Sequence, residues 1–386
     1  MPNVETSVQR RPEEVGVSSA RLSRALALLD AWVEQGRVPG AAAVVLRRGA
    51  VVARHFRGWA VWDSADGELQ PITQDTIFPL ASVTKPISAT AFMLLVEAGE
   101  VILDDPVVRF LPEFGKLGKE QVRVRHLLTH TSGLPDMLPN NESLRKAHSG
   151  LQAFVRSAFR QELAFTPGSR VSYSSTGILV LAEIAERLTR QSFADFMADR
   201  IFRPIGLRSM GLRPSTALYP RIARLRLPEG RTPTDWDNNS HYWRQLGAPW
   251  GGLFATADEV ARFGQLFLEA CGSAGATWQA GPGLVLSPAS ARLMVQDHTR
   301  GIPSVSGVAE SWGLGWALRA GPSGAWAGDL ASPQAFGHIG ASGTMLWVDP
   351  MHELVCVVLT NQITNWSTEY RRFAAFSNAL QAAVVG

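Results

Sequence analysis

The sequence predicts an α+β fold in which an antiparallel sheet is flanked by helices and carries an inserted helical domain. Apolar residues alternate with a period of two near both ends of the chain, whereas between residues 82 and about 275 they recur every three or four positions. A chain of 386 residues is also long for a single core. We therefore expect a discontinuous α/β sandwich domain (1–81 and 305–386) and a mainly helical domain (82–304).

The first part of the chain predicts a helix followed by a hairpin. The helix begins at Ser18 or Ser19, which can cap it, and a glycine ends it. Its apolar residues, which keep helical spacing, are Leu22, Ala25, Leu26, Leu29 and Val33. Two extended segments, 41–46 and 51–56, flank a turn, and a third extended piece runs through 58–62.

The remaining elements follow from the same periodicities. The predicted helices are 87–98, 122–128, 151–159, 178–188, 193–201 and 257–268. The predicted strands are 312–318, 335–339, 344–348 and 354–360, and a helix over 367–385 closes the chain. A long loop over 214–249 interrupts the helices, and loops of that length are usually functional or disordered.

Charge and composition exclude several classes of partner. The net charge of +3 is mild and forms no basic block, so we expect no nucleic-acid partner. Residues 1–14 lack the apolar core of a secretory signal, and no later stretch is apolar enough to span a bilayer. We expect a soluble, cytoplasmic protein without a membrane partner, in which Cys271 and Cys356 are buried free thiols.

One stretch, Phe-Pro-Leu-Ala-Ser-Val-Thr-Lys at 78–85, carries the strongest chemical signal. A helix starting near Ser82 would place the Lys85 ammonium over the Ser82 hydroxyl, because residues three apart share a helix face. A serine needs such a base to become a nucleophile, and a helix N-terminus stabilises developing negative charge. The same spacing is equally consistent with an ordinary capped core helix.

The Ser-x-x-Lys spacing occurs a second time, at Ser143 and Lys146. This copy lies in a polar, turn-rich stretch with no apolar helix behind it. We interpret it as a solvated surface segment.

Two later stretches could complete a catalytic site. Tyr173 lies on a short extended segment with Ser175 two residues on, which suits a proton shuttle if a cation such as Lys85 lowers the pKa of its hydroxyl from about 10. The alternative is a core tyrosine with a satisfied hydroxyl. The glycine-rich strand 336–343 could lie beside a substrate and offer an N–H group to an oxyanion.

In this order, the three stretches resemble the superfamily of serine β-lactamases, penicillin-binding proteins and family VIII carboxylesterases. The resemblance is closest to the class C β-lactamase-like branch and to family VIII carboxylesterases, and it covers nearly the whole chain. Further pieces similar to that branch are 127–135, Pro167-Gly168 and 251–258. The resemblance implies a β-lactamase/DD-peptidase-like fold with the active site at the interface of the two domains.

The resemblance also implies residue roles. Ser82 would be the acylated nucleophile, Lys85 its base or proton-sharing partner, and Tyr173 the shuttle towards the leaving group. The N–H groups of Ser82 and Ala341 would form the oxyanion hole. The residues implied in substrate binding are Ser175, His338, Ile339 and Gly340.

Two departures from the family pattern favour ester hydrolysis. Lactamases and peptidases carry Tyr-x-Asn where this chain has Tyr173-Ser174-Ser175, and Lys-Thr-Gly where it has His338-Ile339-Gly340. Both changes remove groups that recognise a peptide-like amide or carboxylate. We therefore expect a cofactor-free serine carboxylesterase that acts on small neutral esters, its small-molecule partners, through an acyl-enzyme; the oligomeric state is not predicted.

Three other functions remain open alternatives. The same scaffold could serve a β-lactamase or a D-stereospecific peptidase or amidase. It could also serve an acyltransferase, because water and alcohols compete for one acyl-enzyme. A non-catalytic, penicillin-binding-like protein that only binds ligands is the alternative from another class.

Other patterns are weaker. His126 and His130 have the spacing of two metal ligands on a helix, but no third ligand accompanies them, so we expect structural roles and no metal. No Gly-x-Ser-x-Gly elbow occurs, which argues against an α/β-hydrolase. Trp236, Trp243 and Trp250 in the long loop either pack beneath it or line an acyl pocket, and Trp250 is our candidate for substrate binding.

Overall fold

The computed structural model describes residues 8–63, 68–271, 285–319, 322–363 and 366–386. It confirms the α+β class, with a seven-stranded antiparallel sheet in the order β3-β2-β1-β9-β8-β7-β6. The strands are β1 (Gly40–Arg47), β2 (Ala50–Val61), β3 (Gln70–Pro71), β6 (Ala317–Leu318), β7 (Phe336–Gly340), β8 (Thr344–Asp349) and β9 (Leu354–Thr360).

Strands from the N-terminal and C-terminal parts of the chain pair in the middle of this sheet. Strand β1 pairs with β9 from Ala41 opposite Thr360 to Arg47 opposite Leu354. Successive side chains of a strand point to opposite faces, so Val44 faces the core shared with the helical part and Val45 faces a second, smaller core.

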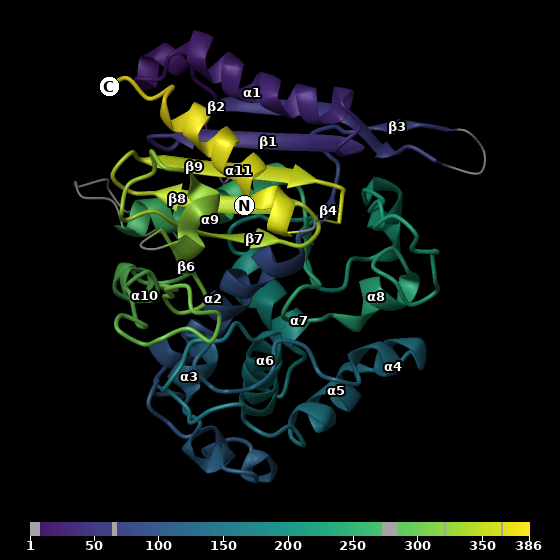
Figure 1. Ribbon diagram of the computed structural model, residues 1–386, viewed down its shortest axis with the longest axis vertical. Coiled ribbons are helices and arrows are strands. Elements are labelled where there is room, and N and C mark those ends of the chain that lie inside the picture. The colour runs from purple at the N-terminus through teal and green to yellow at the C-terminus, as the bar shows by residue number, and fades with distance from the viewer. Residues whose placement is uncertain (1–7, 64–67, 272–284, 320–321, 364–365) are drawn as a thin grey trace.

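Helices cover both faces of the sheet. Helices α1 (Ser19–Glu34) and α11 (Trp366–Gln381) contact each other and share the smaller core (Figure 1). Helix α9 (Ala257–Cys271) packs on β9, β8 and β1 and belongs to the larger core. The sheet is therefore buried on both sides, which explains why β1 is apolar at seven of its eight positions instead of alternating with polar residues.

The helical part lies below the sheet in Figure 1. Its helices are α2 (Thr84–Glu97), α3 (Val124–Leu128), α4 (Asn141–Lys146), α5 (Leu151–Ala158), α6 (Ser175–Thr189), α7 (Phe193–Met197), α8 (His241–Leu246) and α10 (Pro288–Met294). Every side chain of α2 from Thr84 to Leu95 is buried, and α2 contacts α6 and α7. Helix α2 is therefore the central support of this part of the chain.

Several expected element boundaries are wrong. The piece 58–62 is mostly the continuation of β2, which passes through Gly58 at a φ of 77°. The expected strand 312–318 shrinks to β6, because Gly315 turns the chain with a φ of 80°. The loop 214–249 contains α8 and a 3-10 helix, Thr216–Arg221.

Three further expectations concern the domain boundaries, the cysteines and membrane-spanning helices. Helix α9 lies within the expected helical domain but packs on the sheet, and the boundaries at 81 and 305 stay a prediction. Cys271 and Cys356 are free, as expected, although Cys271 is only partly buried. Within the described ranges, no helix is both long and apolar enough to cross a membrane.

Strand β7 runs very close to the segment that precedes Ser82. A Cβ atom added to Gly340 would lie 2.2 Å from the Leu80 carbonyl oxygen and 2.3 Å from Oγ1 of Thr344. The Thr344 hydroxyl donates a hydrogen bond of 2.7 Å to that same carbonyl. Only glycine therefore fits at position 340.

We expect Gly340→Ala to lower the free energy of unfolding by ~1–3 kcal/mol, the usual cost of overpacking. Gly211→Ala is the matched control, because no atom lies within 4 Å of the added methyl group and its φ is not positive. Urea unfolding of both variants measures the difference. Equal midpoints would show that β7 tolerates a side chain at this position.

Candidate active site

Ser82 lies at the junction of a short strand and helix α2. Strand β4 (Phe78–Pro79) pairs with β5 (Phe254–Ala255) and leads into a 3-10 turn, Ala81–Val83. Helix α2 begins only at Thr84, two residues later than we expected for Ser82. Ala81 has a φ of 46°, a strained conformation for a residue with a side chain, and such strain clusters at functional sites.

Lys85 contacts Ser82 as the spacing predicted. Its Nζ atom lies 2.9 Å from Oγ of Ser82 and donates a hydrogen bond of 2.9 Å to the Trp250 carbonyl. Burial lowers the pKa of Lys85 to about 7, and the Asp136 carboxylate opposes this shift only partly. A large share of Lys85 is therefore neutral near pH 7 and can accept a proton from Ser82.

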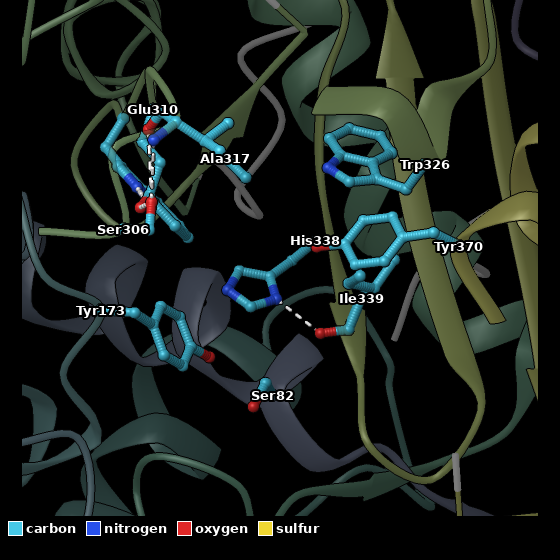
Figure 2. Close-up of a pocket in the computed structure, with 11 residues that line it drawn as sticks. Ser82, Tyr173, Ser306, Glu310, Ala317, Trp326, His338, Ile339 and Tyr370 are labelled. Atoms are coloured by element: carbon cyan, nitrogen blue, oxygen red, sulfur yellow. Dashed lines mark hydrogen bonds between the residues drawn. The ribbon is translucent and has the colours of Figure 1, made fainter. Parts of the chain in front are cut away.

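Tyr173 lies beside both Ser82 and Lys85. The Lys85 Nζ atom is 4.7 Å from the centre of its ring, and the Tyr173 hydroxyl points towards Ser82 (Figure 2). Burial raises the pKa of Tyr173 well above its usual value, although a hydrogen bond with Ser82 opposes this. The condition that we set for a shuttle, a pKa lowered by a cation such as Lys85, is therefore not met, because desolvation is the largest influence on this hydroxyl.

The opposite pKa shifts of Lys85 and Tyr173 suit the two residues to different roles. In the resting site Tyr173 holds its proton, whereas Lys85 has a lone pair available for part of the time. The electrostatics therefore favour Lys85 as the first proton acceptor and Tyr173 as a donor to the leaving group.

The loop that carries Tyr173 is held by His130, within the 127–135 region, and by Asp136, which directly follows it. The Ser174 N–H donates a hydrogen bond of 3.1 Å to Nδ1 of the buried His130. The Ser175 N–H and hydroxyl both donate to the Asp136 carboxylate, at 3.0 and 2.7 Å. Ser175 is therefore tethered to Asp136 and does not line the cavity at Ser82.

His126 and His130, for which we expected structural roles, support different parts of the structure. His126 accepts a hydrogen bond of 3.1 Å from the Arg123 N–H at the start of α3. His130 packs against Tyr173 and Trp312, with ring centres 4.7 and 4.4 Å apart. Each side chain thus supports a local structure, in line with the structural roles that we expected.

Strand β7 brings the glycine-rich stretch to Ser82. It contacts the turn that carries Ser82, and His338 and Ile339 line the adjacent cavity. Burial, with a smaller contribution from Lys85, lowers the pKa of His338 to about 3. Ala341 directly follows β7, and the oxyanion role of its N–H group stays a prediction.

Trp250 does not lie where we expected. Its indole is buried against Phe154, with ring centres 5.9 Å apart, and faces a different, very small cavity beside Asp136. Only its backbone carbonyl reaches the site, through Lys85. The other loop tryptophan that is buried, Trp243, packs under the Arg145 guanidinium at 4.4 Å, so packing explains these aromatic residues.

A cavity of about 360 Å³ opens at Ser82 (Figure 2). Its wall consists of Ser82, Tyr173, Ser306, Val308, Glu310, Trp312, Ala317, Trp326, His338, Ile339 and Tyr370. Glu310, Trp326 and Tyr370, which come from three separate segments in the last quarter of the chain, were not among the predicted site residues. The density of tryptophan after residue 307 was the one available signal.

A serine hydroxyl against a buried lysine, at the end of an antiparallel sheet, is the arrangement expected of a serine nucleophile with its own base, as serine hydrolases have it. The sequence pattern of the Beta-lactamase family matches residues 25–379, and the chain belongs to this family.

The relatives include a protein named as penicillin-binding and a protein named as an esterase. The chain is 33% identical to "Penicillin-binding protein 4" of Amycolatopsis lactamdurans, over 86% of this chain and 83% of that protein. It is 33% identical to "Esterase EstB" of Burkholderia gladioli, over 67% of this chain and 73% of that protein. A solved family VIII carboxylesterase superposes with a TM-score of 0.76 at 20% identity, covering 95% of this chain and 99% of the other, and shows the shared fold.

The two Ser-x-x-Lys copies allow a matched test of the nucleophile. Ser143 lies on the short helix α4, where Lys146 pairs with Glu142 at the surface. We expect Ser82→Ala to lower ester turnover by on the order of 10⁴–10⁶, the scale seen when one member of a catalytic unit is removed. Ser143→Ala should keep wild-type kcat; a loss confined to Ser143→Ala would contradict the assignment.

The pKa of Lys85 predicts the pH profile of the reaction. Below about pH 7 the ammonium form cannot accept a proton, so kcat/KM for p-nitrophenyl acetate should rise with pH and level off above about pH 8. The raised pKa of Tyr173 predicts no fall up to about pH 9. Lys85→Arg, which stays charged, should be inactive throughout; a bell-shaped or flat wild-type profile would exclude this account.

Proposed function

We propose that the protein is a serine carboxylesterase that cleaves small neutral carboxylic esters through an acyl-enzyme on Ser82. The observation that carries this proposal is His338, which is buried and neutral at the place where lactamases and peptidases of this superfamily hold a lysine. Without that cation the site lacks a partner for a substrate carboxylate. The relative named an esterase supports the same choice.

The residues around Ser82 suffice for each proton transfer of the proposed reaction. Lys85 accepts the Ser82 proton as Oγ attacks the ester carbonyl, and the N–H groups of Ser82 and Ala341 hold the resulting oxyanion. Tyr173 passes a proton to the departing alcohol and regains one from Lys85. Water then attacks the acyl carbon and gives a proton to the same pair, which returns a proton to Ser82 Oγ as that oxygen leaves and the acid is released.

The enzymatic alternatives share this first half of the reaction. A β-lactamase or D-stereospecific peptidase would need to bind a carboxylate-bearing substrate, and the penicillin-binding relative keeps that possibility open. An acyltransferase would pass the acyl group to an alcohol instead of water. A non-catalytic binder would not react at Ser82, so labelling by a serine-reactive phosphonate separates it from all the enzymes.

His338→Lys should shift the preference towards carboxylate-bearing lactams. A new charge-assisted contact should improve lactam recognition by roughly 1–2 kcal/mol, while neutral-ester turnover changes much less. The measurement is kcat/KM for a chromogenic cephalosporin divided by that for p-nitrophenyl acetate, from about pH 6 to about pH 8.

His241→Lys is the control, because it adds the same charge at an exposed position on α8. Since the pKa of His338 is about 3, the wild-type ratio should not follow the titration of this histidine in that range. A wild-type enzyme that already prefers the cephalosporin would overturn the esterase assignment in favour of a lactamase.

A further inference from the structure

The wall of the Ser82 cavity carries a single charged group among the residues described. That group is Glu310, which Figure 2 shows at a different end of the cavity from Ser82. Its carboxylate is held in place by neutral donors. The Trp312 indole donates to Oε2 at 3.0 Å and the Ser304 hydroxyl to Oε1 at 2.6 Å. The Ser306 hydroxyl, 3.4 Å from Oε1, can be a third donor when its one proton is not given to the Ser304 oxygen at 2.9 Å.

These donors fix the carboxylate without cancelling its charge. No ion pair joins Glu310 to a basic residue within the described part of the chain, and its two oxygens can accept about four hydrogen bonds in total. Two or three donors therefore leave room for a further N–H donor. A carboxylate in a partly enclosed cavity attracts a cation more strongly than one in open water.

The rest of the wall also favours a cation. Trp312, Trp326, Tyr370 and Tyr173 supply aromatic rings, and the faces of such rings attract ammonium groups. Burial, and then the negative charge of Glu310, raise the pKa of Tyr370, and both residues line the same cavity. The carboxylate and the rings therefore act on the same space.

His338 adds no positive charge to the cavity. Its Nδ1 atom lies 2.7 Å from the Ile339 carbonyl oxygen, which can only accept, so Nδ1 must carry the proton. The lone pair is then on Nε2, which has no hydrogen-bond partner and is covered from solvent. His338 is therefore neutral, and its covered Nε2 atom offers a ligand no open contact.

We propose that the cavity at Ser82 binds a primary ammonium group, with Glu310 as the specificity-determining residue, so that the preferred substrates are small esters that carry an amino group. This inference rests on the ester hydrolysis proposed above and narrows its substrate class. The ammonium takes no part in bond making or breaking, and the acyl transfer at Ser82 is unchanged. The volume of about 360 Å³ suits a compact group of this kind.

Protection of Ser82 against a fluorophosphonate tests the inference without any ester. The probes are n-butylammonium, butan-1-ol and butyrate at about pH 7 and constant ionic strength. We expect n-butylammonium to halve the labelling rate at about one tenth of the concentration that butan-1-ol requires, the scale of a cation held by aromatic rings and a carboxylate. Butyrate should protect least.

Glu310→Gln should reduce this preference for the ammonium by about tenfold, because it removes the charge and keeps the shape. Glu100→Gln is the matched control: Glu100 is exposed, lies beyond the far end of α2 from Ser82, and loses the same charge. Equal protection by n-butylammonium and butan-1-ol in the wild type, which requires no variant, would overturn the inference. Equal effects of the two substitutions would also overturn it.

Ester kinetics separate this inference from the proposed function. Pairs of esters that differ only in an amino or a methyl terminus, on the acyl side or on the alcohol side, should show a higher kcat/KM for the amino member of at least one pair. Selective protection by n-butylammonium without turnover of any ester would support the ammonium site and overturn ester hydrolysis. Turnover of every pair without an amino preference would leave the esterase and overturn the ammonium site.

Discussion

The burial of Lys85 against Ser82 is the interaction on which the site depends. A lysine exposed to water would stay protonated and could not take a proton from a serine. Here the apolar surroundings of α2 lower its pKa to about 7, and the Trp250 carbonyl holds its amine. The central helix must therefore be buried almost completely, which explains why it lies at the meeting point of the sheet and the helical part.

Hydrogen bonds from two sides hold the strained turn that carries Ser82. Strand β5 pairs with the segment before Ser82, and the Leu253 carbonyl accepts a hydrogen bond of 2.8 Å from the Leu80 N–H. From the sheet side, Ser342 and Thr344 donate to the carbonyls of Pro79 and Leu80, at 2.6 and 2.7 Å. These contacts compensate for the unfavourable conformation of the turn.

Local sequence patterns predicted the features that depend on residues close together in the sequence. The spacing of Ser82 and Lys85, the apolar helix behind them and the alternating strands all followed from periodicity. The patterns failed where distant segments decide the outcome. The tether between Asp136 and Ser175, the burial that raises the pKa of Tyr173, and the position of Glu310 in the cavity depend on contacts between segments far apart in the sequence.

The protonation state of Lys85 decides whether Ser82 can be activated, and that state can be observed directly. The chain has only four lysines, so side-chain NMR of lysine-labelled protein resolves few signals, and Lys85→Met identifies the one from the site. We predict that this signal titrates with a midpoint near pH 7. A midpoint above about pH 10, the ordinary value for lysine, would show a permanent cation at Ser82 and contradict the account.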